Sequence, residues 1–271
     1  MPADLFSTLA ELVMASSAWW ATTFIVFMRV GAVFTLFPIT GSASIAAPAR
    51  LGAGLMYAIL VAGLIGPLPG ALPAGAGALA LLLARELLVG AVVGFLARCV
   101  LAGLEFSAEI ASRQMGLNLS ATLDPANNSP VTPLTSFQRL LVAALFFALG
   151  GHHLLMVAMV RSYDVLPIGS AVLGGAGAAT LARAVSGVIE TGLLAAAPVV
   201  VISITVEIVM MTVGRAAPQI PMLLVGYPAK IAAGYFGMAL ALQSMPRLTT
   251  AALTSFGRMS QHLMTALAGG M

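Results

Sequence analysis

The chain has 271 residues, of which 60% are hydrophobic and only 8% are charged, and its formal net charge is +3. A soluble globular domain has about 45–50% apolar and about 25% charged residues. This composition excludes a surface that mostly faces water, so most of the surface must face lipid or other proteins. The 12 basic residues are scattered along the chain, which excludes a basic stripe that follows a nucleic-acid backbone.

Six apolar stretches follow one another along the chain, at residues 18–37, 45–66, 79–104, 134–160, 184–213 and 222–242. Several reach the ~20 residues that a helix needs to cross a bilayer. Lipid allows only helices or closed barrels, and these stretches are continuous rather than alternating. We therefore predict an all-α, multi-pass membrane protein of about six hydrophobic helices, which form a single membrane domain.

Glycine and proline separate these stretches. Pro38 ends the first, residues 66–70 end the second, and the glycines at 174–177 predict a loose connector. Pro198 lies inside the fifth stretch and predicts either a kink or a later start of that helix. Small residues also recur at the spacing of close helix contacts, as in the pairs Gly90 with Gly94 and Gly63 with Gly66.

Arg29 lies near the middle of the first apolar stretch, roughly 15 Å from either end at about 1.5 Å of rise per residue. Insertion of a central Arg costs about 2.5–3.5 kcal/mol. We therefore expect Arg29 to face protein or water and to have a partner. Arg29 then either forms a structural ion pair or caps backbone carbonyls, or it takes a direct part in transport.

Three further charges lie near the ends of the third stretch. Arg85 and Glu86 are adjacent, so they point about 100° apart on a helix and do not simply neutralise each other. Snorkelling to the membrane interface would account for Arg85, Glu86 and Arg98. We nevertheless name Arg85 and Glu86, together with Arg29, as candidate buried structural charges.

A polar segment follows the third stretch. Glu105, Glu109 and Arg113 continue one helical face, in which Glu109 and Arg113 form a favourable pair four residues apart. Beyond them lie Gln114 to Ser120, Asp124-Pro125 and a second Asn- and Pro-rich stretch at 127–130. Such a segment between apolar helices is either a surface loop or a re-entrant element that lines a cavity, and the residues alone favour neither.

Motifs of enzyme chemistry are absent from the sequence. There is no H-E-x-x-H zinc motif, no phosphate-binding G-x-x-x-x-G-K-[ST] loop and no G-x-S-x-G nucleophile elbow. His152 and His153 follow Gly150-Gly151, which predicts a break in the helix. They are adjacent and point to different helix faces, which favours a polar helix-end pair over a metal chelate. Cys99 is the only cysteine and reads as a packed apolar residue. We predict no enzyme activity, no metal and no cofactor.

Five groups of residues follow one another along the chain. The first three are Phe27-Met28-Arg29-Val30-Gly31 with Pro38 and Pro48-Ala49-Arg50; Arg85-Glu86-Leu87-Leu88-Val89-Gly90; and Gln114-Met115-Gly116-Leu117 through Asp124-Pro125. The last two are Gly151-His152-His153 with Ser162 and Leu166-Pro167-Ile168-Gly169; and Gly214-Arg215-Ala216-Ala217-Pro218-Gln219-Ile220 with Val225-Gly226-Tyr227-Pro228 and Lys230. Together and in this order, they resemble the FliR family of export-gate subunits and its virulence-secretion counterparts. The resemblance covers about residues 20–245. The Gly-His-His and Leu-Pro-Ile-Gly elements are more similar to the flagellar branch than to the injectisome branch.

The resemblance implies an architecture. Residues 1–183 would be FliP-like, with a plug loop at about 106–133, and residues 184–242 would form a FliQ-like helical hairpin. The segment 243–271 would be an amphipathic tail, which lies either at the membrane surface or against another export component.

The resemblance also implies a function. The chain would join FliP-like and FliQ-like subunits in the inner-membrane export gate of the flagellar basal body, near FlhB-like and FlhA-like components. Unfolded flagellar proteins would pass through this gate, and the loop would help to plug it. The alternatives are an injectisome homologue and a small secondary transporter, although no repeat between residues 1–135 and 136–271 supports a transporter.

Two sets of site residues follow from this resemblance. The first set would form the plug: Gln114, Met115, Gly116, Leu117, Asn118, Asp124 and Pro125. Gly116 would allow a turn, and Met115 and Leu117 would provide a flexible apolar seal. Asp124 and Pro125 would shape the return of the chain from the plug. The second set is a turn that contacts partner subunits: Arg215, Gln219 and Lys230.

Overall fold

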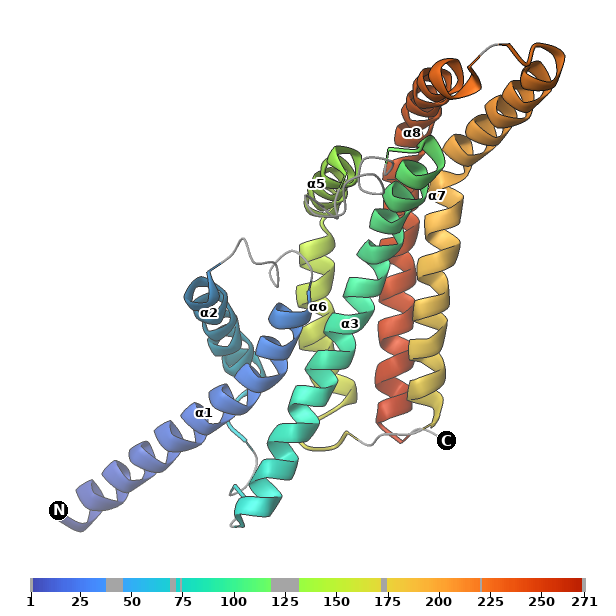
Figure 1. Ribbon diagram of the computed structural model, residues 1–271. Helices are drawn as coiled ribbons and strands as arrows, with labels where there is room; N and C mark the ends of the chain where they lie inside the picture. The colour runs from blue at the N-terminus through green and yellow to red at the C-terminus, as the bar shows by residue number, and fades with distance from the viewer. Residues whose placement is uncertain are drawn as a thin grey trace. The chain divides into compact units, whose positions relative to one another are not determined.

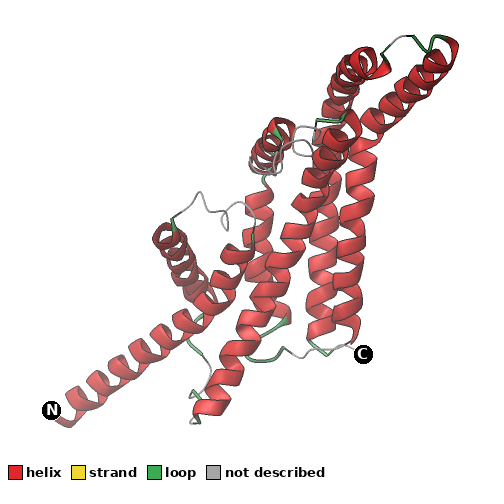
Figure 2. Ribbon diagram, viewed as in Figure 1, coloured by secondary structure: helices red, strands yellow, loops and turns green. Residues whose placement is uncertain are grey.

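The computed structural model describes residues 2–37, 46–68, 72–73, 75–117, 132–171, 175–219 and 221–269. These residues form seven α-helices and no strand: α1 (Pro2–Leu36), α2 (Ala47–Ile65), α3 (Ala76–Met115), α5 (Pro133–Ala148), α6 (Gly151–Val165), α7 (Gly175–Ala216) and α8 (Met222–Leu267) (Figures 1 and 2). Pro38, Asn118, Asp124 and Pro125 lie outside the described residues.

Among the described residues, four helical segments are long and apolar enough to cross a membrane: Ser17–Leu36, Ala47–Ile65, Ala76–Met115 and Gly177–Ala216. The helices α5 and α6 pass the same test only together, as a bent pair, which would make a fifth span. The prediction of an all-α, multi-pass membrane protein is therefore confirmed. The apolar segments form helices because a helix satisfies its backbone hydrogen bonds within itself, which lipid requires.

The chain divides into two compact units. The first consists of residues 1–98, 153–182 and 257–271, and in it α1 packs against α2. The backbone N–H of Leu68, which follows α2, donates to the Thr22 hydroxyl of α1 at 2.9 Å. Helix α1 also approaches α3 closely, because Gly94 of α3 leaves only 3.0 Å between the place of a Cβ and the Val33 Cα.

The second unit consists of residues 99–152 and 183–256. In it, α7 and α8 run side by side (Figure 1), and at Gly237 a Cβ would lie 2.9 Å from the Val199 Cα. The end of α3 packs on α7 in the same way, through Gly103 and Thr191. The apolar core of this unit is formed by side chains from α3, α5, α7 and α8: Ala111, Met115, Leu134, Val199, Met238 and Ala241.

The helix bounds differ from the apolar stretches of the sequence. The stretch 134–160 is two helices, because Leu149 and Gly150 form a turn in which Gly150 has φ +73°. Helix α7 starts at Gly175, inside the predicted connector, and continues through Pro198. Helix α8 continues beyond residue 242 to Leu267, and Leu253, Phe256 and Leu263 are buried.

Candidate functional site: a buried ion pair and the base of the predicted plug

The first site is a buried ion pair between α1 and α3. Arg29 Nε donates to Glu86 Oε2 at 2.8 Å and Arg29 Nη2 donates to Glu86 Oε1 at 3.1 Å, so the pair is bidentate. The exposed fractions of the two side chains are 1% and 0%. A bidentate geometry is the one in which a guanidinium and a carboxylate satisfy each other best.

Helix α6 and the turn after it complete the surroundings of Arg29. Arg29 Nη1 donates to the Ser162 hydroxyl at 2.9 Å, and Nη2 donates to the Leu166 carbonyl at 3.1 Å. The guanidinium carbon also lies 3.9 Å from the centre of the Tyr163 ring, a cation–π geometry. Arg29 therefore joins three separate segments of the first unit.

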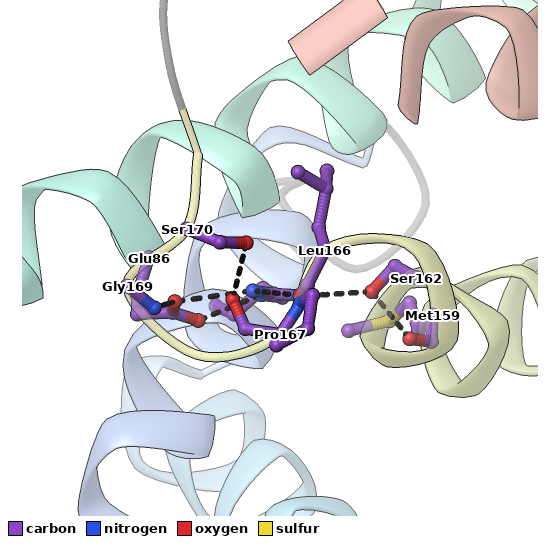
Figure 3. A network of polar contacts seen from close by, with 8 residues as sticks. Glu86, Met159, Ser162, Leu166, Pro167, Gly169 and Ser170 are labelled. Carbon is purple, nitrogen blue, oxygen red and sulfur yellow. Dashed lines mark hydrogen bonds and ion pairs between the residues drawn. The ribbon is translucent and has the colours of Figure 1, made fainter. Parts of the chain in front are cut away.

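Gly169, in the turn after α6, is held by two adjacent residues of α3. Its N–H donates to Glu86 Oε1 at 2.9 Å and its carbonyl accepts from Arg85 Nη1 at 2.8 Å. Figure 3 shows Gly169 facing Glu86 on one side of the turn, with Ser162 on the other. Gly169 has φ +79°, a conformation that favours glycine. The motifs at Arg29, at Arg85-Glu86 and at Leu166–Gly169 are thus parts of one buried network.

The interfacial interpretation of Glu86 is wrong. Glu86 lies on the face of α3 that packs against α1, one helical turn before Gly90, whose own close neighbour is the Arg29 carbonyl. The ~100° between adjacent helical residues therefore turns Glu86 inward, whereas Arg85 is only half-buried and reaches the turn after α6. Arg85 is not a fully buried charge, and Arg98 is exposed.

The second site is the base of the predicted plug. Helix α3 continues to Met115, so residues 106–115 are helical and the predicted loop of 106–133 is shorter at this end than expected. Gly116 has φ +78° and ends the helix. Its carbonyl accepts a hydrogen bond from the Tyr227 hydroxyl of α8.

Met115 is fully buried and packs into the space left by Gly234 of α8. It belongs to the apolar core of the second unit, and Leu117 packs against the same core. In this structure Met115 is therefore a packing residue, and the place where a flexible seal was expected is occupied by an ordered contact between α3 and α8. Gln114 is half-buried in the last turn of α3.

Three hydroxyls join the end of α3 to the start of α5. Ser112 Oγ lies 2.9 Å from Thr132 Oγ1, which lies 2.9 Å from Thr135 Oγ1. Thr132 is also the N-cap of α5, because its hydroxyl accepts from the Thr135 N–H at 3.2 Å. Residues 112–117 and residue 132, which flank the segment 118–131, are therefore held by one unit of the structure.

Around this base lie two ion pairs near the protein surface. Arg113 pairs with Glu109 at 2.9 Å, as the spacing of four residues predicts, and Arg139 of α5 pairs with Glu105 at 3.7 Å. The arginine side chains are 72% and 55% exposed. In water such pairs contribute little to stability, typically about 0–1 kcal/mol, so they add less than the buried contacts.

In the predicted partner-contact turn between α7 and α8, the side chains of Arg215 and Gln219 are exposed. Lys230 differs from them, because its ammonium lies 3.2 Å from a carboxylate oxygen of Glu207 on α7. Lys230 therefore links α8 to α7 within the chain.

Sequence reasoning missed the partners in both sites. Tyr227 and the Leu166–Gly169 stretch were noted only as parts of motifs, and Ser112 and Thr132 were not singled out. The signal in the sequence that could have indicated these partners is glycine beside polar residues in the same motifs. Among the described residues no group of His, Cys, Asp or Glu could hold a metal ion.

The matches with known proteins cover the part of the chain that contains these motifs. Residues 20–256 match the model of the family described as bacterial export proteins, family 1. The chain belongs to this family, the FliR family. A flagellar biosynthetic protein FliR of Caulobacter vibrioides is 30% identical over 226 residues, which cover 83% of this chain and 90% of that protein. The FliR protein of Escherichia coli is 28% identical over 227 residues (82% and 84%), and that of Bacillus subtilis is 24% identical over 214 residues (78% and 82%).

Membership in this family settles two predictions. Proteins of the FliR family are transport components, which confirms that the chain is not an enzyme. The family and the candidate spans together place the chain in the bacterial inner membrane as a multi-pass protein.

Proposed function

We propose that this FliR-family chain is a core subunit of the flagellar protein-export gate, which forms the inner-membrane channel together with FliP-like and FliQ-like subunits. The family match over residues 20–256 is the observation that supports this proposal most directly. Unfolded flagellar proteins would pass through the channel, and FlhB-like and FlhA-like components would lie beside it in the basal body.

Two helices of the chain have apolar faces that fit neighbouring subunits. Only 22% of the most apolar window of α2 and of α7 is buried within the chain. Large exposed side chains lie along both helices: Leu51, Leu55, Met56, Leu60 and Leu64 on α2, and Ile189, Leu193, Leu194, Val201, Ile208, Val209 and Met211 on α7. An apolar face of this extent requires lipid or a partner protein as its neighbour.

We divide the chain as the resemblance implies. Residues 1–183 would correspond to a FliP-like portion and residues 184–242 to a FliQ-like hairpin, with residues 243–271 as its tail. The antiparallel packing of α7 on α8 is compatible with such a hairpin. Arg215 and Gln219, which are exposed at the turn between these helices, are then the residues that contact a partner.

We also propose that the plug element begins at the base described above. Gln114 to Leu117 would start it, and Asn118, Asp124 and Pro125 would belong to the part that closes the channel. Met115 and Gly116 would hold the base of this element rather than seal the channel, since Met115 is fully buried against α8.

The first test is purification of the tagged chain from a mild detergent after expression with the FliP-like and FliQ-like proteins of the same organism. We expect a stable heteromeric particle in which this chain is a minor component by mass. A monomer or small homo-oligomer that binds neither protein would contradict the proposed function and would direct attention to substrate transport.

The second test concerns the plug. Deletion of residues 119–130 keeps Met115, Gly116 and Thr132, so the base and the assembly should remain intact. We expect cells with the assembled mutant complex to leak small ions through the inner membrane. The same amount of assembled complex without added leak would contradict the plug, and cells with the wild-type complex serve as the control.

A further inference from the structure

Tyr227 is the side chain of α8 that reaches the end of α3. Its ring is half-buried, and its hydroxyl donates to the Gly116 carbonyl. If Gly116 had a Cβ, that atom would lie 2.6 Å from the Tyr227 hydroxyl oxygen and 2.9 Å from the adjacent ring carbon. Glycine at 116 is therefore required twice, for φ +78° and for the approach of Tyr227.

The part of α8 that contains Tyr227 is itself held in place on α7. Lys230 pairs with Glu207 at 3.2 Å, one turn after Tyr227. At Gly226 the place of a Cβ lies 3.1 Å from the Met210 methyl carbon of α7. Two contacts, one polar and one apolar, therefore limit any shift of Tyr227 away from Gly116.

A second contact between α3 and α8 lies two helical turns further along α8. Met115 occupies the space that a side chain at Gly234 would need, and its side chain has no exposed surface. Residues on both sides of Gly116 thus pack on α8, because Leu117 adjoins the same apolar core. The Ser112–Thr132–Thr135 hydroxyl cluster adds the start of α5 to this arrangement.

We propose that the contacts of Tyr227 with Gly116 and of Met115 with Gly234 form a fixed anchor at the base of the plug element. These contacts persist during export, and the Tyr227 hydroxyl is the group that positions Gly116. This inference rests on the proposed function and deepens it. The anchor excludes an opening motion in which the end of α3 separates from α8. A small polar contact is expected to set the position of Gly116, while the buried methionine holds the helix end.

The first experiment replaces Tyr227 by Phe in the full complex. Phe keeps the ring and its packing and removes only the hydroxyl, so the yield of purified complex and its thermal unfolding should match the wild type. We expect an increase of about fivefold or more in ion leak through the resting complex. Tyr235→Phe is the matched control, because Tyr235 lies on the same helix and is 53% exposed, and it should leave the leak unchanged.

The second experiment links the two helices covalently. Met115→Cys with Gly234→Cys, in a Cys99→Ser background, places two thiols where the Met115 side chain now meets Gly234. Formation of the disulfide, which needs ~3.5–4.5 Å between the Cβ atoms, is checked first by a non-reducing gel. Secretion of a flagellar substrate should differ less than twofold between oxidised and reduced complex. Each sample is its own control, since the sequence is identical.

The outcomes separate this inference from the proposed function. If the deletion of residues 119–130 leaks but Tyr227→Phe does not, the plug remains and the positioning role of Tyr227 is overturned. If oxidation of the cysteine pair lowers secretion tenfold and a reductant restores it, the anchor must part during export and is not fixed. If neither the deletion nor Tyr227→Phe leaks, the plug and its anchor both fail.

Discussion

At the scale of single residues, the Arg29–Glu86 ion pair joins α1 to α3 inside the first unit. Both side chains are almost completely buried, and each is hydrogen-bonded to the other and to the α6 turn. A buried ion pair is a weak argument for net stability, but the loss of one partner leaves an uncompensated charge that costs about 3–5 kcal/mol. Without Arg29, the hydrogen bond from the Gly169 N–H is what remains to the Glu86 carboxylate among the contacts described above, so the pair is needed to hold α3 against α1.

We predict that Arg29→Ala lowers the yield and the thermal stability of the assembled complex far more than it alters gating in the complex that remains. Glu86→Gln should also destabilise the complex, because the amide oxygen can still accept from Arg29 but the buried guanidinium loses its compensating charge. The measurement is thermal unfolding of purified complex, normalised against export per assembled complex. Normal yield with lost export would show a transport role for Arg29 instead.

The sequence predicted that Arg29 needs a partner but not which one. The need followed from depth alone, because a charge about 15 Å from either end of an apolar helix does not reach water. The identity of Glu86 depends on contact between residues that are 57 positions apart in the chain. Near the end of its own apolar stretch, Glu86 has the same sequence signature as an interfacial charge.

At the scale of helices, the two glycine pairs noted in the sequence have different structural roles. At Gly90 a Cβ would collide with the Arg29 carbonyl and lie 2.9 Å from the Ala32 Cβ, and at Gly94 a Cβ would lie 3.0 Å from the Val33 Cα. At Gly63 nothing lies within 4 Å, and Gly66 serves only as the end of α2 with φ +83°. Both pairs have the spacing of three or four residues that is typical of a close helix contact, so only the tertiary structure shows that the first pair makes such a contact and the second does not.

We predict that Gly90→Ala destabilises the chain and that Gly63→Ala does not. The added methyl at 90 meets backbone atoms of α1, which cannot move without shifting Arg29. At 63 the methyl meets open space, and alanine in a helix is favoured over glycine by roughly 0.5–1 kcal/mol. Thermal unfolding of the two variants in parallel measures the difference, and equal melting temperatures would contradict the close α1–α3 contact.

The adjacent glycines Gly150 and Gly151 predict a break within the apolar stretch 134–160, and the structure confirms it between α5 and α6. The break depends on Gly150, whose φ is +73°. We predict that Gly150→Ala costs about 1–2 kcal/mol, the usual penalty for an L-residue in the left-handed region. Gly187→Ala in α7, where nothing lies within 4 Å, is the control and should be neutral or stabilising.

At the scale of the whole molecule, the exposed apolar face of α7 is too long for lipid alone. Exposed side chains extend from Val185 to Val213, which at 1.5 Å of rise per residue is about 42 Å along the helix. The hydrocarbon core of a bilayer is about 30 Å thick. The face exceeds the core by about 12 Å, so we expect protein to cover roughly a quarter of it.

A photo-reactive side chain tests what covers that face. We predict that p-benzoylphenylalanine at Val201, which is 62% exposed, forms a covalent product with a FliQ-like subunit in cells that express the complete gate. The benzophenone reacts with any C–H bond within reach, so lipid and protein compete on equal terms, and the product's mass identifies the neighbour. The same variant in cells without the FliQ-like protein should lose that product. If the product is absent in both strains while assembly is normal, α7 faces lipid at this position, and the protein that covers the remaining length must lie nearer to Val185 or to Val213.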